Sequence, residues 1–141
     1  MVAFDLDRFI LAQDAIWPTA LAELRAGRKQ THWMWFVFPQ IAGLGSSPTA
    51  VHYAIASADE ARAYLRHPLL GARLGEAVAA MLGHRCRSAE AILGGIDALK
   101  FRSSLTLFEA VADDPGAFGE ALNTFFDGAR DERTLALIPG F

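Results

Sequence analysis

The sequence predicts an all-α fold, and three observations lead to that class. Apolar residues recur at helical spacing along most of the chain, no segment alternates apolar and polar residues as a half-buried strand does, and no Asn-Gly or Asp-Gly pair joins two apolar runs. The length of 141 residues is close to the usual size of one domain. We therefore expect a single domain over residues 1–141, a compact bundle of about seven or eight short, obliquely packed helices.

A proline divides the N-terminal part into two expected helices. The first opens at Asp5 or Asp7, and the positions on its inward face are Leu6, Phe9, Ile10 and Gln13. Pro18 suits the first turn of a second helix, because the backbone N–H that proline lacks would be unpaired there in any case. Gly27 suits the end of that second helix.

Short helices are expected in the middle of the chain. The apolar run over residues 33–38 is interpreted as a helical turn or short helix ended by Pro39, since a lone strand would have no partner. The pair Ser47-Pro48 starts another short helix. Ser57 followed by Glu60 is typical of a capping box at the start of the next one.

The C-terminal half predicts further helices. After Pro68, a long helix presents the apolar stripe Leu70, Leu74, Val78 and Met81. Ser88 caps a short helix that Gly94 and Gly95 break. The apolar positions of the next two helices are Phe101, Leu105, Phe108 and Ala112, and then Phe118, Leu122 and Phe125 after Pro115. A last helix is expected over residues 132–138.

Composition excludes several functional classes. A net charge of -3 gives no electrostatic reason to expect nucleic acid or an anionic membrane. Cys86 is the only cysteine, and the four histidines are too scattered for a helical metal pair, so no metal ligands are predicted. The N-terminus carries acids where a signal peptide needs basic residues, and the longest apolar run is far shorter than the roughly 20 residues that span a bilayer. We expect a soluble, cytoplasmic protein.

Gln13 is a first candidate for a binding residue. It falls on the apolar face of the first helix, where a hydrocarbon side chain would be expected. A buried amide left without hydrogen bonds costs about 1–3 kcal/mol, so this one needs a partner. Two interpretations stay open: the amide bonds a loop carbonyl, or it faces a ligand.

The segment T-H-W-M-W-F-V-F-P-Q, residues 31–40, contains a second set of candidates. Trp33 and Trp35 offer flat faces on which a base or a sugar can stack. His32 and Gln40, near its ends, can hydrogen-bond the polar edges of such a ligand. The alternative is that the aromatic run forms the central core, which explains most of its bulk but neither His32 nor Gln40.

Two further groups combine polar side chains with an expected helix. In G-L-G-S-S-P-T, the backbone amides and Ser46 or Ser47 are candidates for holding an anion such as phosphate, and ordinary capping by Ser47 is the alternative. In I-D-A-L-K-F-R-S-S-L, Asp97 and Lys100 share a helix face, with Ser103 and Ser104 one turn further on and Ser104 at the edge of the core. The alternative there is a surface ion pair worth about 0.2–0.5 kcal/mol.

Four segments together resemble a known family, the domain-of-unknown-function family 1810, also called Rv1873-like. These are F-I-L-A-Q at residues 9–13, G-R-K-Q-T-H-W-M-W-F-V-F-P-Q at 27–40, A-R-A-Y-L-R-H-P-L-L-G-A-R-L at 61–74 and D-A-L-K-F-R-S-S-L-T-L-F at 97–108. The resemblance extends nearly from end to end and implies a compact, mainly helical domain. It implies no established activity.

A fainter likeness is to the NADAR family of NAD- and ADP-ribose-linked proteins. It consists of a Pro-x-x-Gly-x-Arg segment at Pro68, Gly71 and Arg73, followed downstream by Lys100-Phe101. The acidic residues expected in that family have no firm counterpart in this chain.

Two hypotheses of function follow. The first is an enzyme or sensor whose pocket takes a nucleotide-like or ADP-ribose-like ligand, with glycosidic hydrolysis as its reaction if it is an enzyme. The residues expected to hold that ligand are Gln13, Lys29, His32, Trp33, Trp35, Gln40 and Ser46. For catalysis the candidates are Asp97 as general base, Lys100 orienting it, and Ser104. The second hypothesis is a non-catalytic protein-interaction module. The sequence requires no cofactor and does not predict the oligomeric state.

Overall fold

The structure is a computed structural model that describes residues 4–138, and within them it contains nine α-helices and no strand. The helices are α1 Asp7–Ala26, α2 Met34–Val37, α3 Pro48–His52, α4 Ala58–Arg66, α5 Pro68–Leu82, α6 Ala89–Leu93, α7 Gly95–Val111, α8 Gly116–Phe126 and α9 Glu132–Leu137. The all-α class is confirmed, and the number of helices is close to the seven or eight expected.

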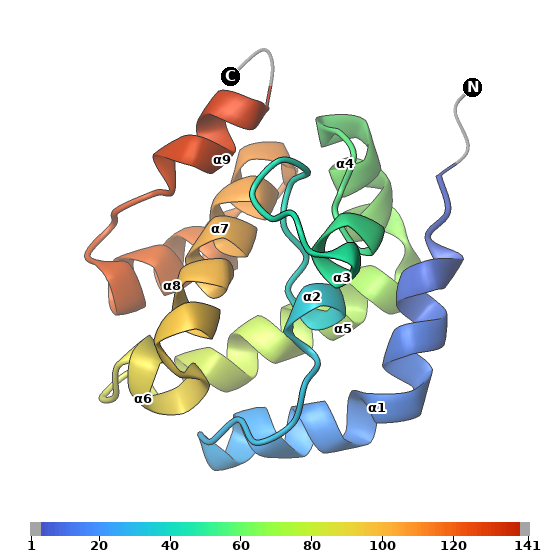
Figure 1. Cartoon of the computed structure of the whole chain (residues 1–141). Helices are drawn as coiled ribbons and strands as arrows, with labels where there is room; N and C mark the ends of the chain where they lie inside the picture. The colour runs from blue at the N-terminus through green and yellow to red at the C-terminus, as the bar shows by residue number, and fades with distance from the viewer. Residues whose placement is uncertain (1–3, 139–141) are drawn as a thin grey trace.

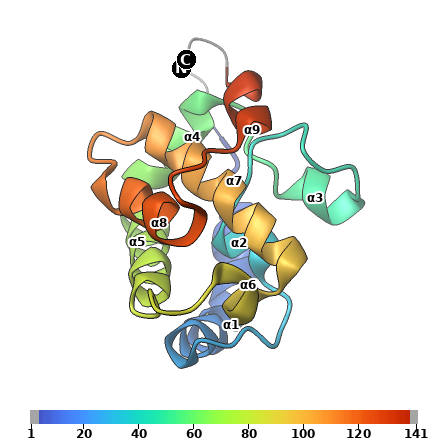
Figure 2. The same ribbon diagram turned by 90° about the vertical axis from the view of Figure 1, so that its left-hand side faces the viewer.

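Helix α7 lies in the middle of the bundle and packs against α4, α6, α8 and α9 (Figure 1). On the other side, α1 and α2 pack against α5, which also contacts α4 and α8. Helix α3 is different, because none of its residues is buried and it stands at the edge of the bundle (Figure 2). An isolated parallel bridge between Ile41 and Ile55 closes the base of the loop that carries α3.

The prediction that Pro18 begins a second helix is wrong. One 20-residue helix, α1, runs through it, with Pro18 inside and Gly27 in the left-handed conformation at its end. A proline inside a helix removes one hydrogen bond and clashes with the preceding turn, so it bends the helix where packing holds both halves in place. Figure 1 shows α1 bent along its length, with its two parts lying along different sides of the bundle.

The caps expected from the sequence are present. The hydroxyl groups of Ser47, Ser57 and Ser88 accept backbone N–H groups at the starts of α3, α4 and α6. Each of these bonds satisfies a donor that the first turn of a helix leaves unpaired. One cap was not expected: His67 precedes Pro68, and its Nδ1 accepts from two amides of the first turn of α5.

The apolar stripes form the core as expected. All four residues of the α5 stripe are buried, and so are Phe101, Leu105 and Phe108 of α7. The run over residues 33–38 is the short helix α2 with its two flanking residues; Trp33, Met34, Val37 and Phe38 are buried. Phe38 meets Phe101 edge-on with ring centroids 4.8 Å apart, so this segment contacts the central helix directly.

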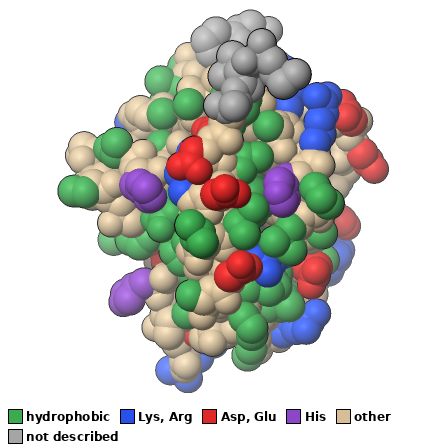
Figure 3. Space-filling model, turned by 90° about the vertical axis from the view of Figure 1, so that its right-hand side faces the viewer, with side chains coloured by type: hydrophobic (Ala, Val, Ile, Leu, Met, Phe, Trp, Pro, Cys, Tyr) green, Lys and Arg blue, Asp and Glu red, His purple; other side chains and the backbone are tan. Residues whose placement is uncertain are grey.

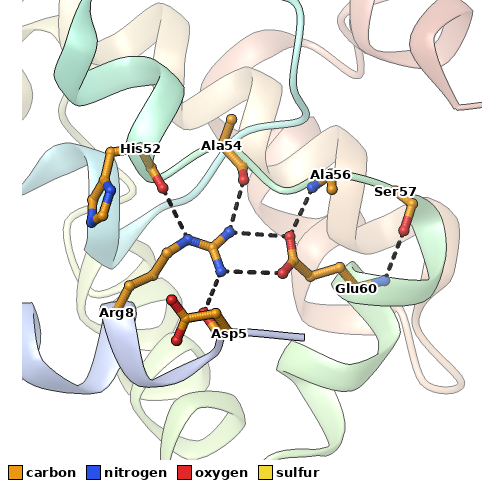
Figure 4. A network of polar contacts seen from close by, with 7 residues as sticks. All are labelled: Asp5, Arg8, His52, Ala54, Ala56, Ser57 and Glu60. Carbon is orange, nitrogen blue, oxygen red and sulfur yellow. Dashed lines mark hydrogen bonds and ion pairs between the residues drawn. The ribbon is translucent and has the colours of Figure 1, made fainter. Parts of the chain in front are cut away.

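A buried ion pair fastens the start of α1 to the chain between α3 and α4 (Figure 4). The Arg8 guanidinium donates to both carboxylate oxygens of Glu60 at 3.1 Å, and the two side chains are only 11% and 4% exposed. Its remaining donors reach the carbonyls of Asp5, His52 and Ala54. A bidentate guanidinium–carboxylate pair fixes direction as well as distance, so it anchors the start of α1 to the chain that runs from the end of α3 into α4.

Charge is distributed without a strong bias over the face shown in Figure 3, which is turned so that the right-hand side of Figure 1 faces the viewer. Acidic, basic and hydrophobic side chains are intermixed there. Across residues 4–138, no helix combines the length and the apolar character that crossing a membrane requires.

We predict that Arg8→Met lowers the free energy of unfolding by about 3–5 kcal/mol, because it leaves the Glu60 carboxylate buried without its cation. Urea denaturation measures the loss. The matched control is Arg66→Met, since Arg66 is 68% exposed and lies 3.9 Å from Asp113, a contact worth at most about 1 kcal/mol. Equal losses in the two variants would contradict the anchoring role of the pair.

Candidate functional site

The candidate site begins with a buried carboxylate on α1. Glu23 is 9% exposed, and four donors from the segment after α1 converge on it. Its Oε1 accepts the backbone amides of Gln30 and Thr31 at 2.8 and 3.0 Å and the indole Nε1 of Trp33 at 2.9 Å. Its Oε2 accepts the Thr31 hydroxyl at 2.8 Å. The carboxylate therefore determines the path of the chain into α2.

These bonds also determine the charge state of Glu23. Burial by itself raises the pKa of a carboxyl, but here the hydrogen bonds from Gln30, Thr31 and Trp33 outweigh it. The pKa of Glu23 falls from 4.5 to about 2. The group is thus a carboxylate under all ordinary conditions, and its four donors depend on that charge.

A chain of charged side chains leads from this segment to α7. The Lys29 ammonium lies 2.9 Å from one Asp97 oxygen, and the Lys100 ammonium lies 3.5 Å from the other. Lys100 in turn sits 4.1 Å from the centroid of the Trp35 ring, within the range of a cation–π contact. One carboxylate is therefore shared by two lysines, and the second lysine is pressed against an indole.

A cleft of about 450 Å³ opens next to the Lys100–Trp35 pair, and we call it the α7 cleft. One wall is the N-terminal half of α7; the loop before α3 and the start of α9, which flank α7 in Figure 2, supply the others. Its lining residues are Trp35, Gln40, Leu44, Gly45, Ser46, Ser47, Ala50, Ile96, Leu99, Lys100, Arg102, Ser103, Asp131 and Arg133. This volume lies in the range of small-molecule sites.

The far end of the α7 cleft is organised by Asp131, the residue before α9. Its Oδ2 accepts the Ser103 hydroxyl and the backbone amide of Thr134, each at 3.1 Å, and also the Thr134 hydroxyl. Its Oδ1 lies 3.5 Å from Nη2 of Arg102. Burial raises the pKa of Asp131, but the bonds from Thr134 and Ser103 and the charge of Arg102 outweigh it and lower the pKa. Asp131 is thus an ionised anchor.

Four of the ten residues proposed for binding or catalysis lie together in the α7 cleft, and Ser47, whose hydroxyl caps α3, lines it too. The four are Trp35, Gln40, Ser46 and Lys100. Asp97 lies behind Lys100, bound to it, but does not line the cleft. These residues come from segments separated by up to 65 positions, so only the tertiary fold brings them together.

The other candidates lie outside the α7 cleft. Gln13 is buried, and its amide nitrogen donates to the carbonyl of Phe36 in α2 and to the Tyr64 hydroxyl. Trp33 is core, and His32 is exposed but is not part of the cleft lining. The ammonium group of Lys29 is used by Asp97. Ser104 is buried, and its hydroxyl has no partner among residues 4–138.

Sequence reasoning missed much of the charged half of the cleft. Arg102, Asp131 and Arg133 were not among the candidates. Of the two serines that follow Lys100, Ser103 lines the wall and Ser104 does not. One sequence signal was available for Asp131, because an aspartate directly before a helix is a preferred cap. No sequence signal distinguishes Arg102 from an ordinary exposed helix arginine.

Both the sequence and the fold of the chain match known proteins. A family model described as a protein of unknown function, DUF1810, matches residues 3–138. The chain belongs to the DUF1810 family. Its fold is similar to the crystal structure of the conserved hypothetical protein Rv1873 from Mycobacterium tuberculosis, with a TM-score of 0.95 and 49% identity over 98% of this chain and 99% of that one. No curated protein matches the chain.

Three residues of the NADAR-like segment, Pro68, Gly71 and Arg73, lie on α5, and each has a structural role there. Pro68 occupies the first turn of the helix. A side chain on Gly71 would place its Cβ 2.2 Å from the Leu65 carbonyl oxygen, so only glycine fits there. Arg73 pairs with Asp14 at 3.1 Å. Of the residues in that likeness, Lys100 alone lines the α7 cleft.

We predict that Glu23→Gln lowers the free energy of unfolding by roughly 3 kcal/mol at neutral pH, because a neutral amide cannot accept all four donors. In the wild type, the stabilisation from the depressed pKa is fully present above about pH 4.5 and is lost as the pH falls towards 2. Urea denaturation at a series of acidic pH values should therefore show a steeper loss in the wild type than in the variant.

The control for this experiment is Asp59→Asn, which also removes one acid but from a side chain that is 79% exposed. Asp59→Asn should follow the wild-type curve. If the wild type and Glu23→Gln lose stability in parallel as the pH falls, Glu23 is not the group that links folding to pH.

Proposed function

We propose that the protein binds a nucleotide-like small molecule, such as a mononucleotide or ADP-ribose, in the α7 cleft. The observation that carries this proposal is the joint presence in one cleft of an indole, an ammonium group and two guanidinium groups. Trp35, Lys100, Arg102 and Arg133 supply them. Bases stack on aromatic rings, and phosphates bind cations, so this combination suits a ligand with both parts.

The polar and apolar lining supports the same class of ligand. Leu44, Ile96 and Leu99 provide an apolar surface for a ring system, and the Gln40 amide can donate to and accept from the edge of a base. Ser46 lies in the loop opposite α7 and supplies a hydroxyl. Small-molecule sites typically combine a mainly apolar lining with a few convergent polar groups.

The geometry supports binding better than it supports hydrolysis at Asp97. A general base must come within about 2.6–3.2 Å of the proton that it removes. Asp97 does not line the cleft, and its two oxygens face the ammonium groups of Lys29 and Lys100. We assign Asp97 the role of positioning Lys100. Chromatography can detect free nucleobase or free ribose released from the bound ligand. If such release occurs and is lost in Asp97→Asn, Asp97 is a general base instead.

A non-catalytic protein-interaction module is the second candidate, and one observation favours it. Ile96 and Leu99, two neighbouring large apolar side chains at the lip of the cleft, are 75% and 61% exposed. A protein partner would cover both side chains. This candidate gains if nucleotides do not bind and if Ile96 and Leu99 are needed for association with a protein.

We predict that AMP or ADP-ribose stabilises the protein against heat. At a ligand concentration a hundred times the Kd, the expected gain of about 3 kcal/mol raises Tm by roughly 10 °C. Trp35→Ala and Lys100→Met should each remove most of the shift. Trp17→Ala is the matched control, because Trp17 is a half-buried tryptophan outside the cleft.

Differential scanning fluorimetry measures these shifts, and calorimetric titration confirms the binding. If none of AMP, ADP-ribose and NAD raises Tm, the proposal is contradicted. A shift that survives in Trp35→Ala would place the ligand elsewhere on the molecule.

A further inference from the structure

We infer that the end of the α7 cleft next to α9 is a phosphate subsite, in which Arg102, together with Arg133 of the same lining, binds a terminal phosphate dianion. This inference rests on the proposed function, since it states which part of a nucleotide-like ligand lies at which end. It gives no contact with the phosphate to Lys29, one of the residues expected to hold the ligand, because its ammonium group is 2.9 Å from Asp97 and Lys29 does not line the cleft.

A comparison with two other partly buried arginines, Arg8 and Arg130, shows why Arg102 is distinctive. Arg8 uses its guanidinium for five hydrogen bonds, to Glu60 and three carbonyls. Arg130 donates to both oxygens of Glu109, to Asn123 and to the carbonyl of Gly128. These two residues act as structural clamps, because their donors end on groups of the chain itself.

Arg102 has the same five donors and far fewer acceptors. Within residues 4–138 its recorded partner is Asp131, whose Oδ1 lies 3.5 Å from Nη2, and its buried Nε has no partner at all. The side chain is 30% exposed, so water cannot surround the whole guanidinium. The buried Nε is closed to a ligand, but the exposed part of the guanidinium lines the cleft, and its remaining N–H donors are what an acceptor-rich ligand needs.

Asp131 holds Arg102 in this position without occupying the N–H donors of the guanidinium. Asp131 is itself bound through Oδ2 to Ser103 and Thr134, so it is not free to close on the guanidinium. It attracts Arg102 through Oδ1 at ion-pair distance only. The arginine is thus oriented by its counter-ion while most of its planar fork is left for a second acceptor.

The charges lining the cleft set the charge of the ligand. Lys100, Arg102 and Arg133 carry three positive charges and Asp131 one negative, which leaves a net charge of 3 − 1 = +2. The pair Lys29 and Asp97 behind the wall adds nothing, since its charges cancel. A phosphate monoester carries about −1.5 to −2 charges at pH 7 and presents three acceptor oxygens, so it matches both the charge and the unused donors.

The apolar lining makes a free phosphate ion a poor match for the whole cleft. Inorganic phosphate has no apolar surface that could pack against the apolar lining, which consists of Leu44, Ala50, Ile96 and Leu99. A phosphate attached to a ring system fills both parts. Adenosine, AMP and inorganic phosphate therefore distinguish the ring, the complete ligand and the anion alone.

The test is a calorimetric titration of the wild type, Arg102→Gln, Arg102→Lys and Arg66→Gln with these three probes. In the wild type we expect AMP to bind roughly ten- to a hundredfold more tightly than adenosine, as a charge-assisted contact to phosphate implies. In Arg102→Gln that ratio should fall close to one while the affinity for adenosine is unchanged. Arg102→Lys should keep part of the preference, because it retains the charge but not the fork.

Arg66→Gln is the charge-matched control, since Arg66 is exposed and outside the cleft, and it should behave as the wild type does. Equal affinities of the wild type for adenosine and AMP would overturn the subsite but leave the proposed function standing. An equal loss of both ligands in Arg102→Gln would show that Arg102 only supports the fold, which also overturns the inference. If neither adenosine nor AMP binds the wild type, the proposed function fails and the subsite fails with it.

Discussion

The structure depends most on one buried carboxylate, that of Glu23. Four donors from the next ten residues end on its two oxygens, and they include the indole of Trp33, a fully buried core side chain. A carboxylate buried without such donors would be strongly destabilising. The bend after α1, the entry into α2 and the position of the first core tryptophan are therefore one coupled arrangement, and it persists only while Glu23 is charged.

The candidate site is built outward from that arrangement. The segment that Glu23 holds contains Lys29, whose ammonium group pairs with Asp97 of α7. The segment continues to Trp35, whose ring contacts Lys100, also of α7 and also paired with Asp97. Along this segment Trp33 and Met34 pack into the core, whereas Trp35 lines the α7 cleft. The aromatic block thus serves the core and the cleft together. A cleft that is assembled from the core in this way needs no flexible loop to align its cations.

Periodicity was sufficient for most of the fold but not for the cleft. The α5 stripe and the serine caps depend on residues close in sequence, so local spacing predicts them well. The prediction at Pro18 was wrong because the flanking sequence is compatible both with a proline in the first turn of a helix and with one inside a bent helix. The packing of both halves of α1 decides between the two. Trp35, Gln40, Ser46 and Lys100 were candidates because their side chains can stack on a ligand, hydrogen-bond it or pair with an acid, and all four line the cleft. Glu23, Arg102 and Asp131 were not, because what sets them apart is which donors are used, and only tertiary contacts determine that.

The central claim is that the charge of Glu23 holds the segment leading into α2 and, through it, the wall of the cleft. Amide hydrogen exchange of Gln30 and Thr31, measured in the wild type and in Glu23→Gln under native conditions, tests this most directly. The account predicts that both amides are protected in the wild type and exchange much faster in Glu23→Gln, while the amides of α5 and α8 keep their protection. Unchanged protection of Gln30 and Thr31 in the variant would contradict it.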